Sequence, residues 1–90
     1  MTAAPPLTGI RVLDFTRVIA GPYCAMTLAD LGAEIVKVEN PGMGDDGRQY
    51  KPPGLPGDGP SFVYLNRHKR SIAIDISKPD GQELCRKLAA

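Results

Sequence analysis

The fold is decided by one stretch, which reads Leu13-Asp14-Phe15-Thr16-Arg17-Val18-Ile19-Ala20-Gly21-Pro22. An apolar run ends at an acid, a short loop follows, and Gly-Pro opens a predicted helix. In open α/β sheets, ligands bind outside the carboxyl ends of the strands, where the N-termini of helices point. This strand-to-helix turn is therefore the first place to look for a binding site.

The residues around the turn predict a β-α-β unit with two parallel strands. Residues 10–15 form a strand with apolar residues on both faces, as in a strand covered on both sides. Pro22 fits the first turn of the helix, and Gly32 is a good residue to end it. The second strand is Glu34 to Glu39, in which Lys37 is an unexplained charge. The apolar face of the helix is predicted to contain Cys24, Leu28 and Leu31, with Ala25 and Ala29 beside them.

The remainder of the chain predicts a long loop followed by a β-α pair. Eleven of the twenty-one residues from Asn40 to Pro60 are Gly or Pro, which indicates a surface lid or a segment ordered by another part of the protein. Residues 61–65 are of uncertain type, with one helical turn capped by Ser61 as an option. Residues 71–76 alternate as a strand, and Ser77 is predicted to cap the last helix.

Length and composition restrict the classes of protein. Ninety residues allow one small domain, and a net charge of +1 gives no reason to expect nucleic-acid binding. No apolar run is long enough to span a membrane, and the N-terminus does not resemble a secretory signal. Cys24 and Cys85 have no metal-binding spacing, so we expect both to be buried thiols of a cytoplasmic protein.

Two features suggest that the chain is the opening of a longer protein. The last helix reaches Ala90 without a glycine, asparagine or proline to end it. Three strands and two full helices also cannot cover both faces of a parallel sheet. We therefore expect a domain that is incomplete and does not fold stably alone.

Residues 42–47 match the dinucleotide-binding pattern G-x-G-x-x-G, but we reject this interpretation. The pattern requires glycines directly after the first strand of a β-α-β unit, whereas these follow the second strand and include two acids. A flexible turn is the preferred interpretation of this segment.

The turn at residues 16–20 is a better candidate, because unpaired backbone N–H groups at a helix N-terminus can bind an anionic or carbonyl group. Arg17 adds a positive charge, although it could equally be solvated while its neighbours pack. The basic run at residues 67–70 is either a solvated turn or a phosphate contact. The sequence contains one histidine, His68, and shows no convincing nucleophile–base pair, so we predict neither a catalytic residue nor a metal site.

Several motifs together resemble the N-terminus of the class III CoA-transferases, a family that includes formyl-CoA transferase, carnitine CoA-transferase and succinyl-CoA:glutarate CoA-transferase. The α-methylacyl-CoA racemases are similar in the same region. The matching residues are Gly9 to Thr16, Ala20-Gly21-Pro22, Leu28 to Glu39, Pro41-Gly42, Gly44-Asp45, Arg48, Asn66, Lys69 to Ile72, Asp75 and Lys78.

The resemblance implies an α/β fold, a partial Rossmann-like parallel sheet in which residues 1–90 are the N-terminal part of a large CoA-binding domain. The segment 40–60 would be a Gly/Pro-rich loop within that domain. Members of the family form dimers whose two chains interlock. The catalytic aspartate of the family lies well beyond position 90, so these residues would contribute binding and no chemistry.

The resemblance also implies a set of residues that contact coenzyme A, which is a substrate here and not a resident cofactor. Val18, Ile19 and Ala20 would line the CoA site, with Arg17 as an accessory. Asn40 would lie near the adenine, Ile74 at the end of the third strand, and Ser77 and Lys78 near the phosphates.

The predicted function is a CoA-transferase that moves CoA from an acyl-CoA donor to a free carboxylic acid through an aspartyl intermediate. Two alternatives remain open: an acyl-CoA racemase, and a non-catalytic fragment or binding module. An Asp nucleophile downstream would indicate the transferase, whereas an Asp/His pair would indicate the racemase.

Overall fold

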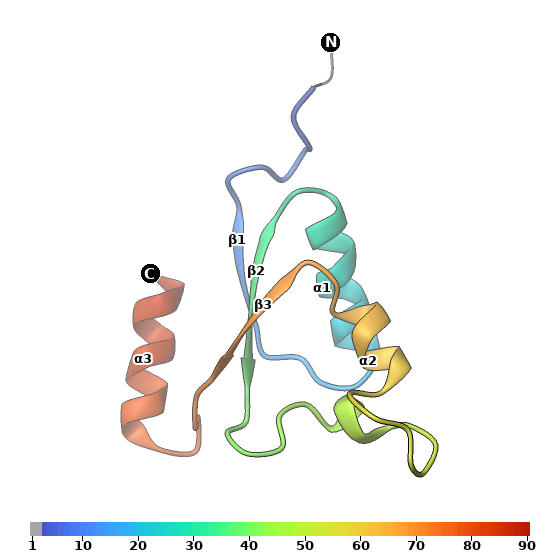
Figure 1. Ribbon diagram of the computed structural model, residues 1–90. Coiled ribbons are helices and arrows are strands. Elements are labelled where there is room, and N and C mark those ends of the chain that lie inside the picture. The colour runs from blue at the N-terminus through green and yellow to red at the C-terminus, as the bar shows by residue number, and fades with distance from the viewer. Residues whose placement is uncertain (1–2) are drawn as a thin grey trace.

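The computed structural model describes residues 3–90, which form an α/β structure around a parallel three-stranded sheet (Figure 1). The strands are β1 (Arg11–Asp14), β2 (Glu34–Glu39) and β3 (Lys69–Ala73), and they lie in the order β1-β2-β3. Leu13 pairs with Val36, and Val38 pairs with Ile72. The predicted α/β class and parallel β-α-β unit are therefore confirmed.

The helices lie on both faces of the sheet (Figure 1). The helical elements are α1 (Ala20–Asp30), the short 3-10 helix η1 (Asp46–Gln49), α2 (Pro60–Leu65) and α3 (Pro79–Ala89). Helices α1 and α2 lie on one side and α3 on the other. Gly32 follows α1 with a φ of +105°, a left-handed conformation that glycine adopts without steric cost.

Two apolar clusters hold the layers together, one on each face of the sheet. Ala25 of α1 packs with Ala33 and Ile35, and on the other face Val38 packs with Ile74 and Cys85 of α3. Alternation along β2 explains the division, because successive side chains of a strand point to opposite faces. Both faces of β2 are thus covered, as in the strands of buried parallel sheets.

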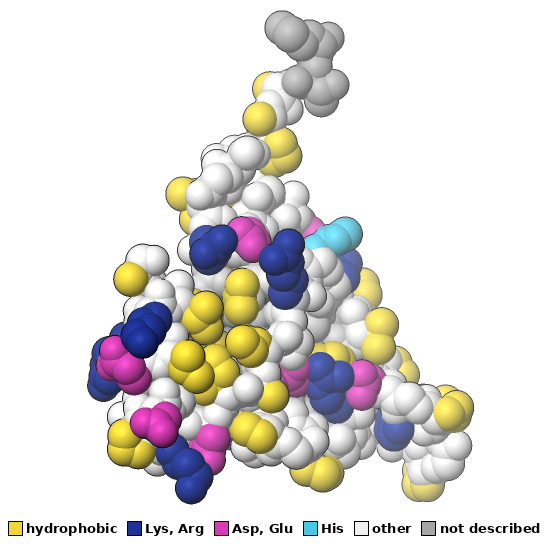
Figure 2. Space-filling view, turned by 60° about the vertical axis from the view of Figure 1, so that its left-hand side comes forward, with side chains coloured by type: hydrophobic (Ala, Val, Ile, Leu, Met, Phe, Trp, Pro, Cys, Tyr) yellow, Lys and Arg dark blue, Asp and Glu magenta, His cyan; other side chains and the backbone are white. Residues whose placement is uncertain are grey.

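Helix α3 covers only part of its face of the sheet. Figure 2 shows hydrophobic side chains gathered beside this helix and bordered by charged groups. Ile72 of β3 lies two residues before the buried Ile74, yet it is 39% exposed. The expectation of an incompletely covered sheet agrees with this arrangement.

The structure corrects several predicted boundaries. The third strand is Lys69–Ala73 and not residues 71–76, because parallel pairing with β2 begins at Lys69 and residues 74–78 turn toward α3. The first strand is also shorter than residues 10–15 at both ends. Neither predicted serine cap is present: Gly59 caps α2, and Lys78 caps α3.

The apolar face of α1 is rotated relative to the prediction. Its buried residues are Pro22, Ala25 and Met26, whereas Cys24 is exposed. One residue corresponds to about 100° around a helix, so a face centred on Ala25 and Met26 leaves Cys24 toward solvent. The prediction that both thiols are buried is therefore wrong for Cys24 and confirmed for Cys85.

The Gly/Pro-rich segment 40–60 is more ordered than a lid without regular structure. It contains η1, in which Gly47 is buried, and the first residue of α2. The N–H of Gly59 donates to the carbonyl oxygen of Arg48 (2.7 Å), which closes the segment on itself. A Cβ at Gly59 would lie 2.6 Å from the carbonyl oxygen of Tyr50, so this close approach requires glycine.

Candidate functional site

A pocket of about 230 Å³ lies at the carboxyl ends of the three strands. It is lined by residues 15–17 after β1, residues 38–40 at the end of β2, and residues 74–77 after β3, together with Gly44 and Asp45. The opening turn therefore meets the other two strand ends, which is where open parallel sheets bind ligands.

Four of the eight predicted binding residues line this pocket: Arg17, Asn40, Ile74 and Ser77. Ile19 instead borders a shallower hollow of about 370 Å³ together with Pro60 and residues 61, 64 and 65. Val18, Ala20 and Lys78 line neither hollow, although Ala20 begins α1 and Lys78 caps α3.

The side chain of Arg17 forms an ion pair with Asp46, with 2.5 Å between Nη2 and Oδ2. Both side chains are more than half exposed, so the pair is weak and solvent competes with it. An anionic ligand entering the pocket can therefore recruit the guanidinium at small cost.

Beneath the turn lies a buried ion pair between Asp14 and Lys69, whose Oδ2 and Nζ are 3.0 Å apart. The other carboxylate oxygen of Asp14 accepts hydrogen bonds from the backbone N–H (2.7 Å) and hydroxyl (2.5 Å) of Thr16. Burial alone would raise the pKa of Asp14, but the bonds from Thr16 and Lys69 outweigh it and lower that pKa. Lys69 also donates to the carbonyl oxygen of Pro22 (3.2 Å), so it ties the strand end to the helix start.

A second buried ion pair joins Lys37 of β2 to Asp45 of the Gly/Pro-rich segment, with 2.8 Å between Nζ and Oδ2. The exposed fractions are 1% for Lys37 and 2% for Asp45. Lys37 also donates to the carbonyl oxygen of Thr16 (3.0 Å), while Asp45 Oδ1 accepts from the N–H groups of Val18 (3.0 Å) and Gly47 (2.9 Å). Burial opposes the charge of Asp45, but these contacts lower its pKa.

The backbone of Val18 is in the left-handed region, with a φ of +72°. A β-branched residue is a genuine outlier in this region, because its Cβ approaches the backbone closely. Such a conformation persists only where surrounding contacts determine it.

A third ion pair, between Arg48 and Glu39, fixes the segment 40–60 to the end of β2. Arg48 binds both carboxylate oxygens of Glu39, at 2.8 Å from Nε and 2.6 Å from Nη2, and lies 4.0 Å from the ring centre of Phe62. The backbone N–H of Asp45 and the hydroxyl of Ser71 also donate to Glu39. The Arg48 contact is the main cause that lowers the pKa of Glu39 to about 2.

The basic run at residues 67–70 does not form one phosphate-binding cluster. Arg67 pairs with Asp30 of α1 (2.7 Å) and lies over the ring of Tyr64. Lys69 points into the interior, where burial lowers its pKa against the attraction of Asp14. The interpretation of these residues as a solvated turn or a phosphate contact is therefore wrong for Lys69.

The residues that the structure adds to the site are Lys37, Asp45 and Lys69. A lysine within a strand that is apolar on both faces is itself a signal of a buried partner, because an unpaired charge is too costly to bury. That signal was present at Lys37, but the sequence could not identify which acid would meet it.

Within residues 3–90, no group of three or more His, Cys, Asp and Glu side chains is placed to hold a metal ion. The buried carboxylates described above are each engaged by a cation, so they are arranged to hold structure and not to attack a substrate. Over the same residues, no helix has the length and apolar character needed to cross a membrane.

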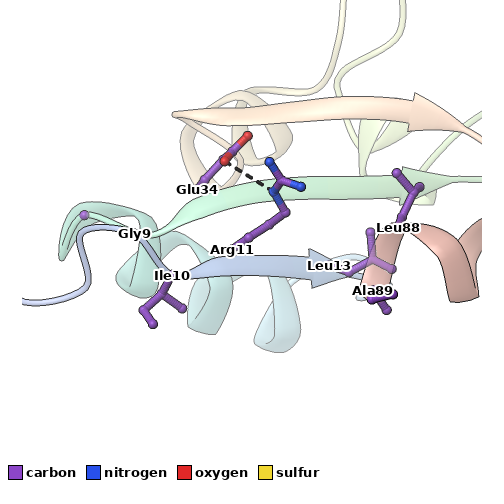
Figure 3. A pocket seen from close by; sticks show the side chains of 9 residues that line it. Gly9, Ile10, Arg11, Leu13, Glu34, Leu88 and Ala89 are labelled. Carbon is purple, nitrogen blue, oxygen red and sulfur yellow. Dashed lines mark hydrogen bonds and ion pairs between the residues drawn. The ribbon is translucent and has the colours of Figure 1, made fainter.

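A second pocket, of about 390 Å³, lies at the opposite end of the sheet (Figure 3). Its charged side chains, Arg11 and Glu34, pair with one another at 3.3 Å, and Ile10, Leu13 and Leu88 contribute apolar surface. This pocket faces the amino ends of the strands, away from the turn.

Comparison with known proteins identifies the relatives of this chain. Residues 7–90 match the sequence profile of CoA-transferase family III. The chain is 51% identical over 85 residues to succinyl-CoA:glutarate CoA-transferase of Mus musculus, covering 94% of the chain and 20% of that protein. It is 45% identical over 84 residues to formyl-CoA:oxalate CoA-transferase of Bradyrhizobium diazoefficiens, covering 91% of the chain and 19% of that protein.

The solved structures show the same fold. A CaiB/BaiF family protein from Brucella suis superimposes with a TM-score of 0.86 at 41% sequence identity, covering 96% of this chain and 24% of that one. The chain therefore spans about a fifth of the length of the curated relatives and a quarter of this structure.

Proposed function

Because this chain belongs to CoA-transferase family III, we propose that residues 1–90 are the N-terminal part of the CoA-binding domain of a longer CoA-transferase. That enzyme would move CoA from an acyl-CoA donor to a free carboxylic acid. The observation that carries the proposal is the pocket of about 230 Å³ at the strand ends, which brings Arg17, Asn40, Ile74 and Ser77 together.

The pocket suits a ligand with both flat apolar and polar parts. Ile74 contributes a buried apolar side chain, Asn40 an amide, and Ser77 a hydroxyl, while Arg17 offers a charge for an anionic group. These residue types match the adenine and phosphate groups of a CoA moiety. The turn at Val18, Ile19 and Ala20 would form the wall along which the remainder of the molecule lies, with Lys78 near the phosphates.

The proposed reaction begins with an aspartate outside residues 1–90. Its carboxylate oxygen attacks the thioester carbonyl, the C–S bond breaks, and CoA leaves as a thiolate with a mixed anhydride on the aspartate. The CoA thiolate then attacks the aspartyl carbonyl of this anhydride, which releases the donor acid and leaves an aspartyl-CoA thioester. The acceptor carboxylate attacks that thioester and expels CoA as a thiolate, giving a second mixed anhydride. The thiolate finally attacks the acceptor carbonyl, which forms the new acyl-CoA and frees the aspartate carboxylate. The residues of this chain would hold the CoA moiety, and binding energy from that remote part of the substrate is used at the reacting carbonyl.

The names of the relatives supply a first set of substrates. Succinyl-CoA as donor, with glutarate or oxalate as acceptor, combines the acids named for the mouse and Bradyrhizobium proteins. We further propose a cytoplasmic, interlocked homodimer of the full-length protein, which gel filtration with light scattering would detect as twice the chain mass.

The test is transfer of CoA by the full-length protein that carries these residues. We expect CoA to move from succinyl-CoA to one of these acids, measured by separating the acyl-CoA species chromatographically. The relatives named above are transferases, so a racemase has less support. A protein that exchanges the α-proton of a 2-methylacyl-CoA in deuterated water and transfers no CoA would contradict the proposal.

A further inference from the structure

The left-handed backbone of Val18 requires an explanation, because a β-branched residue does not adopt a φ of +72° without a compensating contact. This residue lies in the middle of the turn that the proposed function assigns to CoA binding. Val18 lines neither of the two hollows described above, but its backbone N–H is engaged by a hydrogen bond.

That contact comes from Asp45. Its Oδ1 accepts the backbone N–H of Val18 at 3.0 Å and that of Gly47 at 2.9 Å. A carboxylate that accepts a backbone N–H in a buried site forms one of the stronger hydrogen bonds in proteins. The orientation of the Val18 N–H is therefore tied to a side chain from a different segment of the chain.

Lys37 completes the arrangement from the other side of Arg17. Its ammonium lies 2.8 Å from Asp45 Oδ2 and donates to the carbonyl oxygen of Thr16 at 3.0 Å. The pair thus holds one peptide group before Arg17 and one after it. These two contacts fix the φ and ψ of Arg17. On the other side of Val18 the chain is held by α1, because the N–H of Tyr23 donates to the carbonyl oxygen of Ile19 (2.9 Å). With its own N–H held by Asp45 and the following residue held by the helix, Val18 has little freedom to return to a negative φ.

We propose that Asp45, held in place by Lys37, is a positioning residue for the binding of CoA. It keeps Val18 in the left-handed conformation and so fixes the course of the chain through Ile19 and Ala20. The inference rests on the proposed function, because it assumes that this turn contacts the CoA moiety. It adds a role for the Gly/Pro-rich segment, which supplies Asp45 and lines the pocket through Asn40, Gly44 and Asp45.

The test uses the full-length protein and two double variants without charges in the pair. Lys37→Met with Asp45→Asn keeps an oxygen that accepts the Val18 N–H, whereas Lys37→Met with Asp45→Leu has a side chain of similar size and no acceptor. We expect the dissociation constant for CoA, measured by calorimetric titration, to be about tenfold higher in the Leu variant than in the Asn variant. Asp58→Asn, which alters an exposed partner of Arg48, is the control and should stay near the wild-type value.

A positioning role predicts coupling to residue 18, whereas a merely structural role does not. Glycine adopts positive φ without cost, so adding Val18→Gly to both double variants should reduce their difference to less than about threefold. If the tenfold difference persists with glycine at position 18, Asp45 does not act through the Val18 backbone.

The outcomes separate this inference from the proposed function. If the wild-type protein does not bind CoA, the proposed function fails and the inference fails with it. If it binds CoA but the Asn and Leu variants bind equally, only the inference is overturned. Should the Leu variant not fold, the melting temperature of Val18→Gly should exceed that of Val18→Ala, and the reverse order would overturn the left-handed constraint.

Discussion

Glu39 is a buried carboxylate, 6% exposed, that Arg48, Ser71 and the backbone of Asp45 hold in its charged form. Its pKa in the folded state is about 2, against 4.5 for an unperturbed group. A depressed pKa stabilises the folded state above pH 4.5, and this stability is lost as the pH falls toward 2.

The size of this effect follows from the shift. It corresponds to about 3 kcal/mol of unfolding free energy. We expect the full-length protein to lose this stability between pH 4.5 and 2, measured by urea unfolding at several pH values. Glu39→Gln should be less stable at pH 7 and should show a flatter profile over the same range. An unchanged slope in that variant would assign the acid sensitivity to other groups.

Ala20 is the exposed first residue of α1, at the end of the turn that we assign to CoA. Replacing it with tryptophan places a large ring where the turn meets the ligand. We expect the dissociation constant for CoA to rise by about tenfold, or about 1.4 kcal/mol. Thr27→Trp, an exposed position later in the same helix, is the matched control. Equal affinities in the two variants would remove the start of α1 from the binding site.

At the scale of elements, Arg48 connects the Gly/Pro-rich segment to β2 and α2. Removing it with Arg48→Ala leaves Glu39 buried without its cation, which we expect to cost about 3 kcal/mol of stability. The segment 40–60 should also become more susceptible to limited proteolysis. Arg17→Ala, which breaks the exposed pair with Asp46, should cost less than about 1 kcal/mol. Similar losses of unfolding free energy in the two variants would show that burial of the Glu39–Arg48 pair does not increase its contribution to stability.

The elements could be predicted where local sequence and packing agree. β2 has the predicted bounds, because its branched residues are buried on both faces and Gly32 marks its start. The predicted bounds of β3 are wrong because Lys69 follows two other basic or polar residues and resembles part of a solvated turn. In the structure its side chain instead reaches Asp14 of β1 across the sheet. The local sequence pattern around Lys69 contains no information about a partner so distant in the sequence.

The sequence predicts where the pocket lies, but it does not predict the buried ion pairs that hold the surrounding turn in place. The turn after β1 lies at the strand ends, as its sequence indicates, and Asn40, Ile74 and Ser77 join Arg17 there. Asp45 lies in a segment without periodicity, so its pairing with Lys37 depends on the path of the whole segment. Within residues 42–47, the carboxylate of Asp45 accepts the N–H of Gly47, which is unfavourable for binding a pyrophosphate there.

At the scale of the molecule, the described residues leave much apolar surface uncovered. Large side chains at least half exposed occur on several elements: Ile10, Ile19, Tyr23, Met43, Tyr50, Val63, Tyr64, Ile76 and Leu84. With the order β1-β2-β3, the outer edges of β1 and β3 have no partner strand among residues 3–90. Both features belong to a domain that needs further chain to complete its core.

We therefore expect residues 1–90, produced alone, to show no cooperative thermal transition by circular dichroism. The isolated chain should bind a dye specific for exposed apolar surface, and the full-length protein should bind it much less. A sharp, reversible transition in the monomeric 90-residue chain would contradict this expectation.

The closed base of the Gly/Pro-rich segment has a consequence for protein engineering. The Gly59–Arg48 hydrogen bond and the contact of Lys51 with the carbonyl oxygen of Gly57 join the two sides of the segment, while residues 52–57 are exposed. There is open space around Gly54 and Gly57, although both have a positive φ (+83° and +77°) and should be kept as glycines. Residues 52–57 therefore form an exposed tip beyond the closed base of the segment. An epitope or a fluorescent label can be inserted in this tip without disturbing the strand ends.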